Sequence, residues 1–85
     1  MDLNEIRSEI DKIDDELVRL FCQRMHVAAQ VADYKKANNL PIFQPARERA
    51  KLQDVAEKAG PEMANYTRVL YSMLFELSRS YQSKR

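Results

Sequence analysis

Apolar residues recur at alternating steps of three and four along the first part of the chain. They are Leu3, Ile6, Ile10, Ile13, Leu17, Leu20, Val27, Val31 and Tyr34. This spacing is typical of one long helix whose apolar stripe packs against other helices. At about 1.5 Å per residue, a helix from Leu3 to Tyr34 is about 48 Å long. Asp2 or Asn4 can cap its start, and we predict that it ends near Asn38, where turn-forming residues precede a proline.

Two further helices are predicted in the rest of the chain. Pro45 fits the first turn of a second helix, with Gln44 as a weak cap and Gly60 at its end. Its apolar face is formed by Leu52, Val55, Ala56 and Ala59. A third helix is expected from Pro61, in the first helical position, to about Ser83. The stripe of this third helix is Tyr66, Leu70, Met73 and Leu77.

The chain therefore reads as one all-α domain over residues 1–85. It has no strand pattern, internal repeat or linker long enough to divide domains. A single core of this size is marginal, and the residues after the first helix cannot cover both ends of so long a rod. We expect a homodimer in which a second copy supplies the missing cover.

The composition shows no overall charge or hydropathy bias, so the function must depend on a few residues at local sites. The chain has 14 Lys and Arg against 13 Asp and Glu, so its net charge is +1. It lacks the excess of basic residues that is typical of nucleic-acid-binding proteins. No apolar run approaches the roughly 18 residues of a membrane span. The single Cys22 cannot form an intrachain disulfide, and the chain does not open with a secretory pattern, so we expect a cytoplasmic protein.

Arg24 interrupts the apolar stripe of the first helix, and burying a lone charge is costly unless something pairs with it. Arg24 could fix the register of helix packing, or pack its stem while the guanidinium reaches solvent. Alternatively, it marks an anion site inside the bundle. Lys35 lies about 20° around the helix and about 16 Å along it, so both cations could converge on one small anion. Taken alone, Lys35 is also an ordinary cation near a helix C-terminus.

Arg7 flanks the same stripe and, in isolation, reads as a surface arginine. It lies about 25 Å along the axis from Arg24, which is too far for both to hold one small ligand within a chain. If the long helices of two protomers run antiparallel, Arg7 of one approaches Arg24 and Lys35 of the other. The expected dimer would then build shared sites.

Four more polar residues are candidates. Arg47 and Glu48 fall in the first turn of the second helix, where the helix dipole favours Glu48 but not Arg47, so Arg47 is the better candidate to face an anion. Ser78 and Gln82 end an apolar i+4 row on the third helix. They are either part of a fraying end or neutral hydrogen-bonding groups aimed into the bundle. The single His and Cys have no partners at metal-ligand or nucleophile spacing.

The ordered set of residues resembles the all-helical class of chorismate mutases over essentially the whole chain. The matching positions are Ile6-Arg7, Ile13-Asp14, Leu17, Arg24, Lys35, Pro41, Arg47-Glu48, Ser78 and Gln82. The resemblance implies an intertwined homodimer with two active sites and no cofactor or metal. Each site would convert chorismate to prephenate by an intramolecular Claisen rearrangement in aromatic amino acid biosynthesis.

The resemblance also implies how the two carboxylates of chorismate are held. Arg24 and Arg47, with the partner's Arg7, would bind them, and Ser78 would assist at one. Cations and neutral donors suffice for this reaction, because it needs no proton transfer and no covalent intermediate.

The remaining roles concern the reacting ether and the ring. By similarity, Lys35 and Gln82 donate to the ether oxygen as negative charge grows there, and with Arg24 they form the expected catalytic set. Glu48 would accept from the ring hydroxyl. Gln44 departs from the family pattern, since many members carry Asp there, and it is included as a substrate-binding residue.

Two other functions fit parts of the pattern. An isochorismate pyruvate lyase shares the fold and the dianion site, but Glu48 suits the hydroxyl of chorismate and favours the mutase. A non-catalytic helical dimerisation module would tolerate Arg24→Ala, because that change relieves desolvation of a charge. The sequence leaves open whether the mutase is free-standing or a domain of a longer enzyme.

Overall fold

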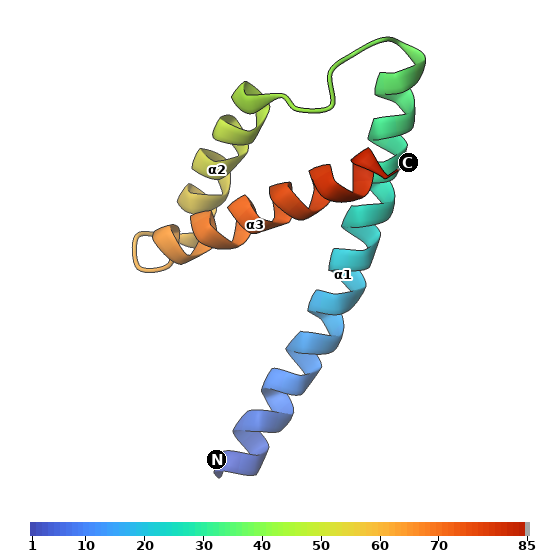
Figure 1. The fold of residues 1–85 in the computed structure, drawn as a ribbon. Coiled ribbons are helices and arrows are strands. Elements are labelled where there is room, and N and C mark those ends of the chain that lie inside the picture. The colour runs from blue at the N-terminus through green and yellow to red at the C-terminus, as the bar shows by residue number, and fades with distance from the viewer. Residues whose placement is uncertain (85) are drawn as a thin grey trace.

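The computed structural model describes residues 1–84 and contains three helices (Figure 1). They are α1 (Leu3–Ala37), α2 (Pro45–Ala59) and α3 (Ala64–Ser83). No strand occurs in the described part of the chain. The all-α class, with one long, one short and one medium helix, is confirmed.

Both ends of α1 lie where the sequence predicts them. The Asp2 side chain accepts a hydrogen bond of 2.8 Å from the backbone N–H of Glu5 and so caps the first turn. At the other end Asn38 is the cap, and Asn39 adopts a positive φ of 56°, which asparagine tolerates better than most residues. The backbone N–H of Leu40 then donates to the carbonyl of Lys35, at 2.8 Å. The chain therefore turns back toward the last turn of α1.

The bounds of α2 also agree with the prediction. Gln44 is its N-cap residue but makes no side-chain cap hydrogen bond, and Pro45 occupies the first turn. Gly60 ends the helix with a φ of 84°, a backbone conformation that residues with a Cβ rarely adopt. Val55 and Ala56 of the predicted apolar face are buried.

The predicted start of the third helix at Pro61 is wrong. The helix begins at Ala64, and residues 61–63 form a turn in which the backbone N–H of Met63 donates to the carbonyl of Gly60 at 3.2 Å. The reason is that α2 and α3 pack against each other, so the chain must reverse between them. Pro61 presets the backbone for a turn as readily as for a first helical residue.

The three helices do not form a closed bundle (Figure 1). α3 packs against α2 and crosses the C-terminal half of α1, while the N-terminal half of α1 extends away from both. The radius of gyration is 15.9 Å, against about 12 Å for a compact chain of this length. None of the helices in residues 1–84 has the length and hydropathy that a membrane span requires.

The long apolar stripe of α1 is not covered within the chain. Its nine residues are between 41 and 64% exposed, and the only buried residues of α1 within the described range are Ala29 and Ala32. Large aliphatic side chains in this number and order are unusual on a free surface. Within residues 1–84, the structure does not supply the contact that the stripe predicts.

The stripe predicted for the third helix is exposed as well, so its packing against the other helices of the same chain is not observed. Tyr66, Leu70, Met73 and Leu77 all lie on the uncovered side of α3. The buried face carries Phe75, Ser78 and Gln82 instead. Ser78 and Gln82 on this face form hydrogen bonds with Arg24 and Ala28 of α1.

Candidate active site

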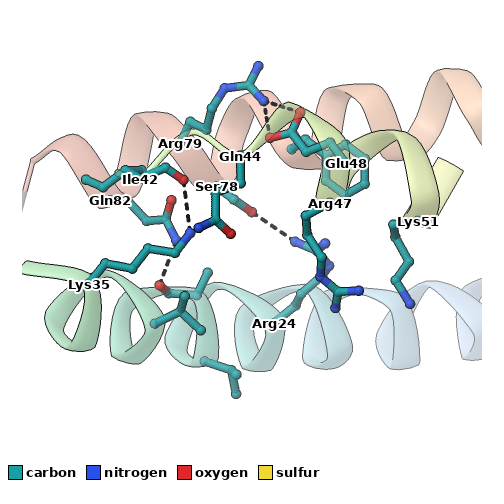
Figure 2. Close-up of a pocket in the computed structure, with 14 residues that line it drawn as sticks. Arg24, Lys35, Ile42, Gln44, Arg47, Glu48, Lys51, Ser78, Arg79 and Gln82 are labelled. Atoms are coloured by element: carbon teal, nitrogen blue, oxygen red, sulfur yellow. Dashed lines mark hydrogen bonds and ion pairs between the residues drawn. The ribbon is translucent and has the colours of Figure 1, made fainter. Parts of the chain in front are cut away.

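A pocket of about 360 Å³ lies between the C-terminal half of α1, the start of α2 and the C-terminal half of α3 (Figure 2). Seven of the eight predicted site residues line it: Arg24, Lys35, Gln44, Arg47, Glu48, Ser78 and Gln82. Arg7 does not, because it lies on the exposed N-terminal part of α1. A volume of this size suits one small molecule.

Arg24 is held by neutral partners. Its Nη1 donates to the hydroxyl oxygen of Ser78 at 2.9 Å. The guanidinium carbon lies 5.6 Å from the ring centre of Phe75 and 5.9 Å from that of Tyr71, within cation–π range. None of the carboxylates in residues 1–84 forms an ion pair with it. The half-buried charge is therefore oriented but not neutralised.

Lys35 and Gln82 each donate to a backbone carbonyl on the pocket wall. The ammonium Nζ of Lys35 donates to Ile42, in the loop before α2, at 3.0 Å. The amide Nε2 of Gln82 donates to Ala28 on α1 at 2.9 Å. An ammonium has three N–H donors and an amide two, so each group retains at least one donor beyond that bond. Figure 2 shows the two side chains close together at one end of the pocket.

Ser78 and Gln82 are 8 and 7% exposed, the only buried polar side chains in the described part of the chain. Both lie inside α3, so the interpretation of this row as a fraying end is wrong. Buried polar groups need hydrogen-bond partners, and both have them. The i+4 spacing brings the two residues to the same face of α3, which is turned toward α1.

Arg47 and Glu48 leave the first turn of α2 in different directions (Figure 2). Arg47 extends toward α1 near Arg24, is exposed, and forms no ion pair within residues 1–84. Glu48 pairs with Arg79 of α3, whose Nη1 contacts both carboxylate oxygens. Gln44 lies on the wall beside them.

Two cations of the pocket were not predicted from the sequence, Lys51 and Arg79. Lys51 lies one helical turn after Arg47, a spacing that could have identified it. It donates to the Asp54 carboxylate at 3.3 Å, and Lys58 donates to the same oxygen at 3.0 Å. The hydrogen bonds from Lys58 and Lys51 lower the pKa of Asp54 from its ordinary value. Arg79 had no such signal, because Glu48 is distant in the sequence.

The pocket combines five cations with a single carboxylate, that of Glu48. Arg79 is paired with Glu48, and Lys51 is paired with Asp54. Arg24, Lys35 and Arg47 remain without a carboxylate partner in residues 1–84. Three cations with nearby neutral donors have the chemistry to bind a small, multiply charged anion.

A family model described as chorismate mutase type II matches residues 6–83, which include α2, α3 and all of α1 except its first three residues. The chain belongs to the chorismate mutase type II family.

Three relatives are similar to this chain, and chorismate mutase is named in two of them. A T-protein of Haemophilus influenzae is 48% identical over 61 residues, covering 68% of this chain and 16% of the relative. A bifunctional chorismate mutase/prephenate dehydratase of Buchnera aphidicola is 33% identical over 85 residues, 98% of this chain and 22% of the relative. A chorismate mutase of Methanocaldococcus jannaschii is 40% identical over 47 residues, 55% and 48% of the two chains. The alignments therefore span less than half the length of each relative.

Proposed function

We propose that this protein is a chorismate mutase, an isomerase that converts chorismate to prephenate in phenylalanine and tyrosine biosynthesis. The observation that carries the proposal is the convergence of Arg24, Lys35 and Arg47, without carboxylate partners in residues 1–84, on one pocket of about 360 Å³. The chain's membership of the chorismate mutase type II family supports the same reaction.

The proposed chemistry needs only what the pocket contains. Chorismate is a dianion, and its Claisen rearrangement proceeds within one molecule without proton transfer or a covalent intermediate. An enzyme accelerates it by holding the reactive chair-like conformer and by stabilising the charge that separates across the breaking ether bond. Fixed cations and neutral donors do both, so the mechanism uses no cofactor or metal.

In this mechanism Arg24 and Arg47 bind the substrate carboxylates, and Ser78 orients Arg24 while assisting at one of them. The hydrogen bond between Arg24 and Ser78 supports this division, because it aims the guanidinium without cancelling its charge. Lys35 and Gln82 donate to the ether oxygen. Their neighbouring positions in Figure 2 support a shared target.

Glu48 accepts from the ring hydroxyl, and Gln44 completes the substrate-binding wall. Both line the pocket from the start of α2. This role of Glu48 favours the mutase over an isochorismate pyruvate lyase, which shares the fold and the dianion site.

The active form is proposed to be an intertwined homodimer with two shared sites. The uncovered stripe of α1 supports a partner, and a second copy offers a stripe of the same chemistry, as a two-fold interface requires. Arg7 of one protomer would complete the pocket of the other and add a third arginine for the carboxylates. Residues 1–85 then form one mutase domain, which acts in the cytoplasm alone or as part of a longer enzyme.

The test is an assay of chorismate loss by purified protein whose oligomeric state is measured by sedimentation. The expected product is prephenate. Release of pyruvate from isochorismate, without prephenate formation from chorismate, would instead identify a lyase. Absence of turnover by a correctly folded dimer would leave only a helical dimerisation module.

A further inference from the structure

Arg79 is a pocket residue to which the proposed mechanism assigns no role. It follows Ser78 on α3 and lines the same pocket. Its side chain contacts two other elements of the fold, Glu48 on α2 and Phe43 in the loop before α2.

The guanidinium of Arg79 is fixed on its edge and on its face. On the edge, Nη1 contacts both carboxylate oxygens of Glu48 (Figure 2). On the face, the guanidinium carbon lies 4.8 Å from the ring centre of Phe43. A planar, delocalised cation suits this combination, and a lysine would provide only a point charge. Phe43 thus covers one side of the ion pair.

This ion pair differs from the exposed pairs of the chain. The side chains of Arg79 and Glu48 are 33 and 24% exposed, against 59 and 63% for Arg19 and Glu16. Exposed pairs contribute little because solvent screens them and both side chains must be ordered. A half-buried, charge-assisted contact holds a carboxylate more firmly.

The contact leaves Glu48 able to bind a ligand. An ionised carboxylate offers about four lone-pair positions, and a single nitrogen shared between its oxygens occupies only part of them. Glu48 lines the pocket, and its remaining lone-pair positions can accept a further hydrogen bond.

We propose that Arg79 is a positioning residue, which fixes the Glu48 carboxylate to accept a hydrogen bond from the ring hydroxyl of the substrate, while Phe43 holds Arg79 in place. Arg79 thereby sets the preference for substrates that carry this hydroxyl. The inference rests on the proposed function, because it acts through the role given there to Glu48.

The experiment compares chorismate with an analogue that has hydrogen in place of the ring hydroxyl. The variants are Arg79→Gln, Arg79→Lys, Glu48→Gln and the double variant of Arg79→Gln with Glu48→Gln. Arg68→Gln, an exposed arginine elsewhere on α3, is the matched control. Values of kcat and KM are measured for both substrates, and circular dichroism reports whether each variant folds.

For chorismate, Arg79→Gln is expected to lower kcat/KM about tenfold to a hundredfold, the range for losing a hydrogen bond to a charged group. For the analogue the same change should be under about twofold, because the missing hydroxyl removes the interaction that Arg79 prepares. The double variant should have the same kcat/KM for chorismate as Glu48→Gln alone. Arg79→Lys should regain part of the loss, and Arg68→Gln should match the wild type.

A second variant guards against a failure of Arg79→Gln to fold. Phe43→Leu changes an exposed loop residue and leaves both members of the ion pair in place. It should lower kcat/KM for chorismate by less than Arg79→Gln does, and it should have little effect on the analogue that lacks the hydroxyl.

Equal losses on the two substrates would overturn the inference, since Arg79 would then only join α2 to α3 or bind a carboxylate itself. Wild-type activity in all Arg79 and Phe43 variants would also overturn it, but would leave the mutase proposal intact. If the wild-type protein turns over neither substrate, the mutase proposal fails and the inference fails with it.

Discussion

Arg24 on α1 and Ser78 on α3 are joined by a hydrogen bond of 2.9 Å across a sequence separation of 54 residues. The arginine is the one charged position in an otherwise apolar stripe, and the serine is one of two buried polar residues of α3. A neutral partner orients the cation without neutralising its charge. An arginine held in this way can still bind an anion, whereas an arginine in a buried salt bridge is already neutralised by a carboxylate.

Arg24→Ala should abolish most of the activity while sparing the fold. Loss of a preorganised charge at the reacting centre costs about a hundredfold to a thousandfold in kcat or more. The free energy of unfolding should not fall by more than about 1 kcal/mol, because the lost contacts with Ser78, Tyr71 and Phe75 are offset by the relieved desolvation of a cation without a carboxylate partner. Chorismate turnover and urea unfolding measure the two effects.

The matched control for that variant is Arg19→Ala, which removes an exposed arginine of the same helix. It should keep full activity. An Arg24→Ala protein with unchanged turnover would contradict the mechanism and support a register-fixing role for Arg24.

Ser78→Ala should also lower activity, but by less than Arg24→Ala does. Without the hydroxyl, Arg24 loses the hydrogen-bond partner that orients it, and a hydrogen bond to a charged group contributes about 1.5–3 kcal/mol, or roughly a tenfold to hundredfold loss in kcat/KM. Ser80→Ala removes an exposed hydroxyl from the same helix and should be silent. Additive effects of Ser78→Ala and Arg24→Ala would show that the two residues act independently.

The helices were predictable because their signals are local. The 3–4 periodicity, the caps at Asp2 and Gly60, and the proline at position 45 each act within a few residues. The start of α3 was not predictable in this way. Pro61 fits a turn as well as a first helical residue, and the choice depends on how α2 and α3 pack.

The site was predictable where residues share a helix face. Arg24 and Lys35 on α1, and Ser78 and Gln82 on α3, line one pocket as their spacing indicates. The contacts of Arg79 with Glu48 and Phe43 join three separate elements, so no periodicity reveals them. Nor does the sequence show that Lys35 donates to the carbonyl of Ile42, because that contact depends on the path of the loop.

Leu17→Asp should dissociate the proposed dimer. Leu17 lies in the exposed part of the α1 stripe, and burying a leucine contributes about 1.5–3 kcal/mol. The substitution loses that contribution in both protomers and adds two unpaired carboxylates, so the dimer dissociation constant should rise at least about a hundredfold. Sedimentation equilibrium measures it, and Lys12→Ala, on the exposed polar side of α1, is the control. A monomeric wild-type protein would contradict the dimer directly.

The role proposed for the neutral side chain of Gln82 leads to a prediction of how activity varies with pH. A carboxamide is neutral throughout the ordinary range, so turnover should show no steep loss between roughly pH 6 and 8. Gln82→Glu places a group with an ordinary pKa of about 4.3 at the ether oxygen. Its carboxylate would repel the developing negative charge, and activity should fall about a hundredfold at neutral pH and recover as the pH is lowered toward that pKa.

Gln30→Glu adds the same charge at an exposed position of α1 and should leave the pH profile unchanged. A flat profile for Gln82→Glu would place position 82 away from the reacting oxygen.

Arg7 provides the sharpest test of shared sites. Arg7→Ala and Arg24→Ala chains should each be inactive, because each homodimer lacks one of the two arginines in both of its sites. After the chains are unfolded and refolded together, half of the dimers should be mixed, and one site in each mixed dimer should contain both arginines. About a quarter of wild-type activity should therefore return. No recovery, with mixed dimers verified by mass spectrometry, would place Arg7 outside the site or in the site of its own chain.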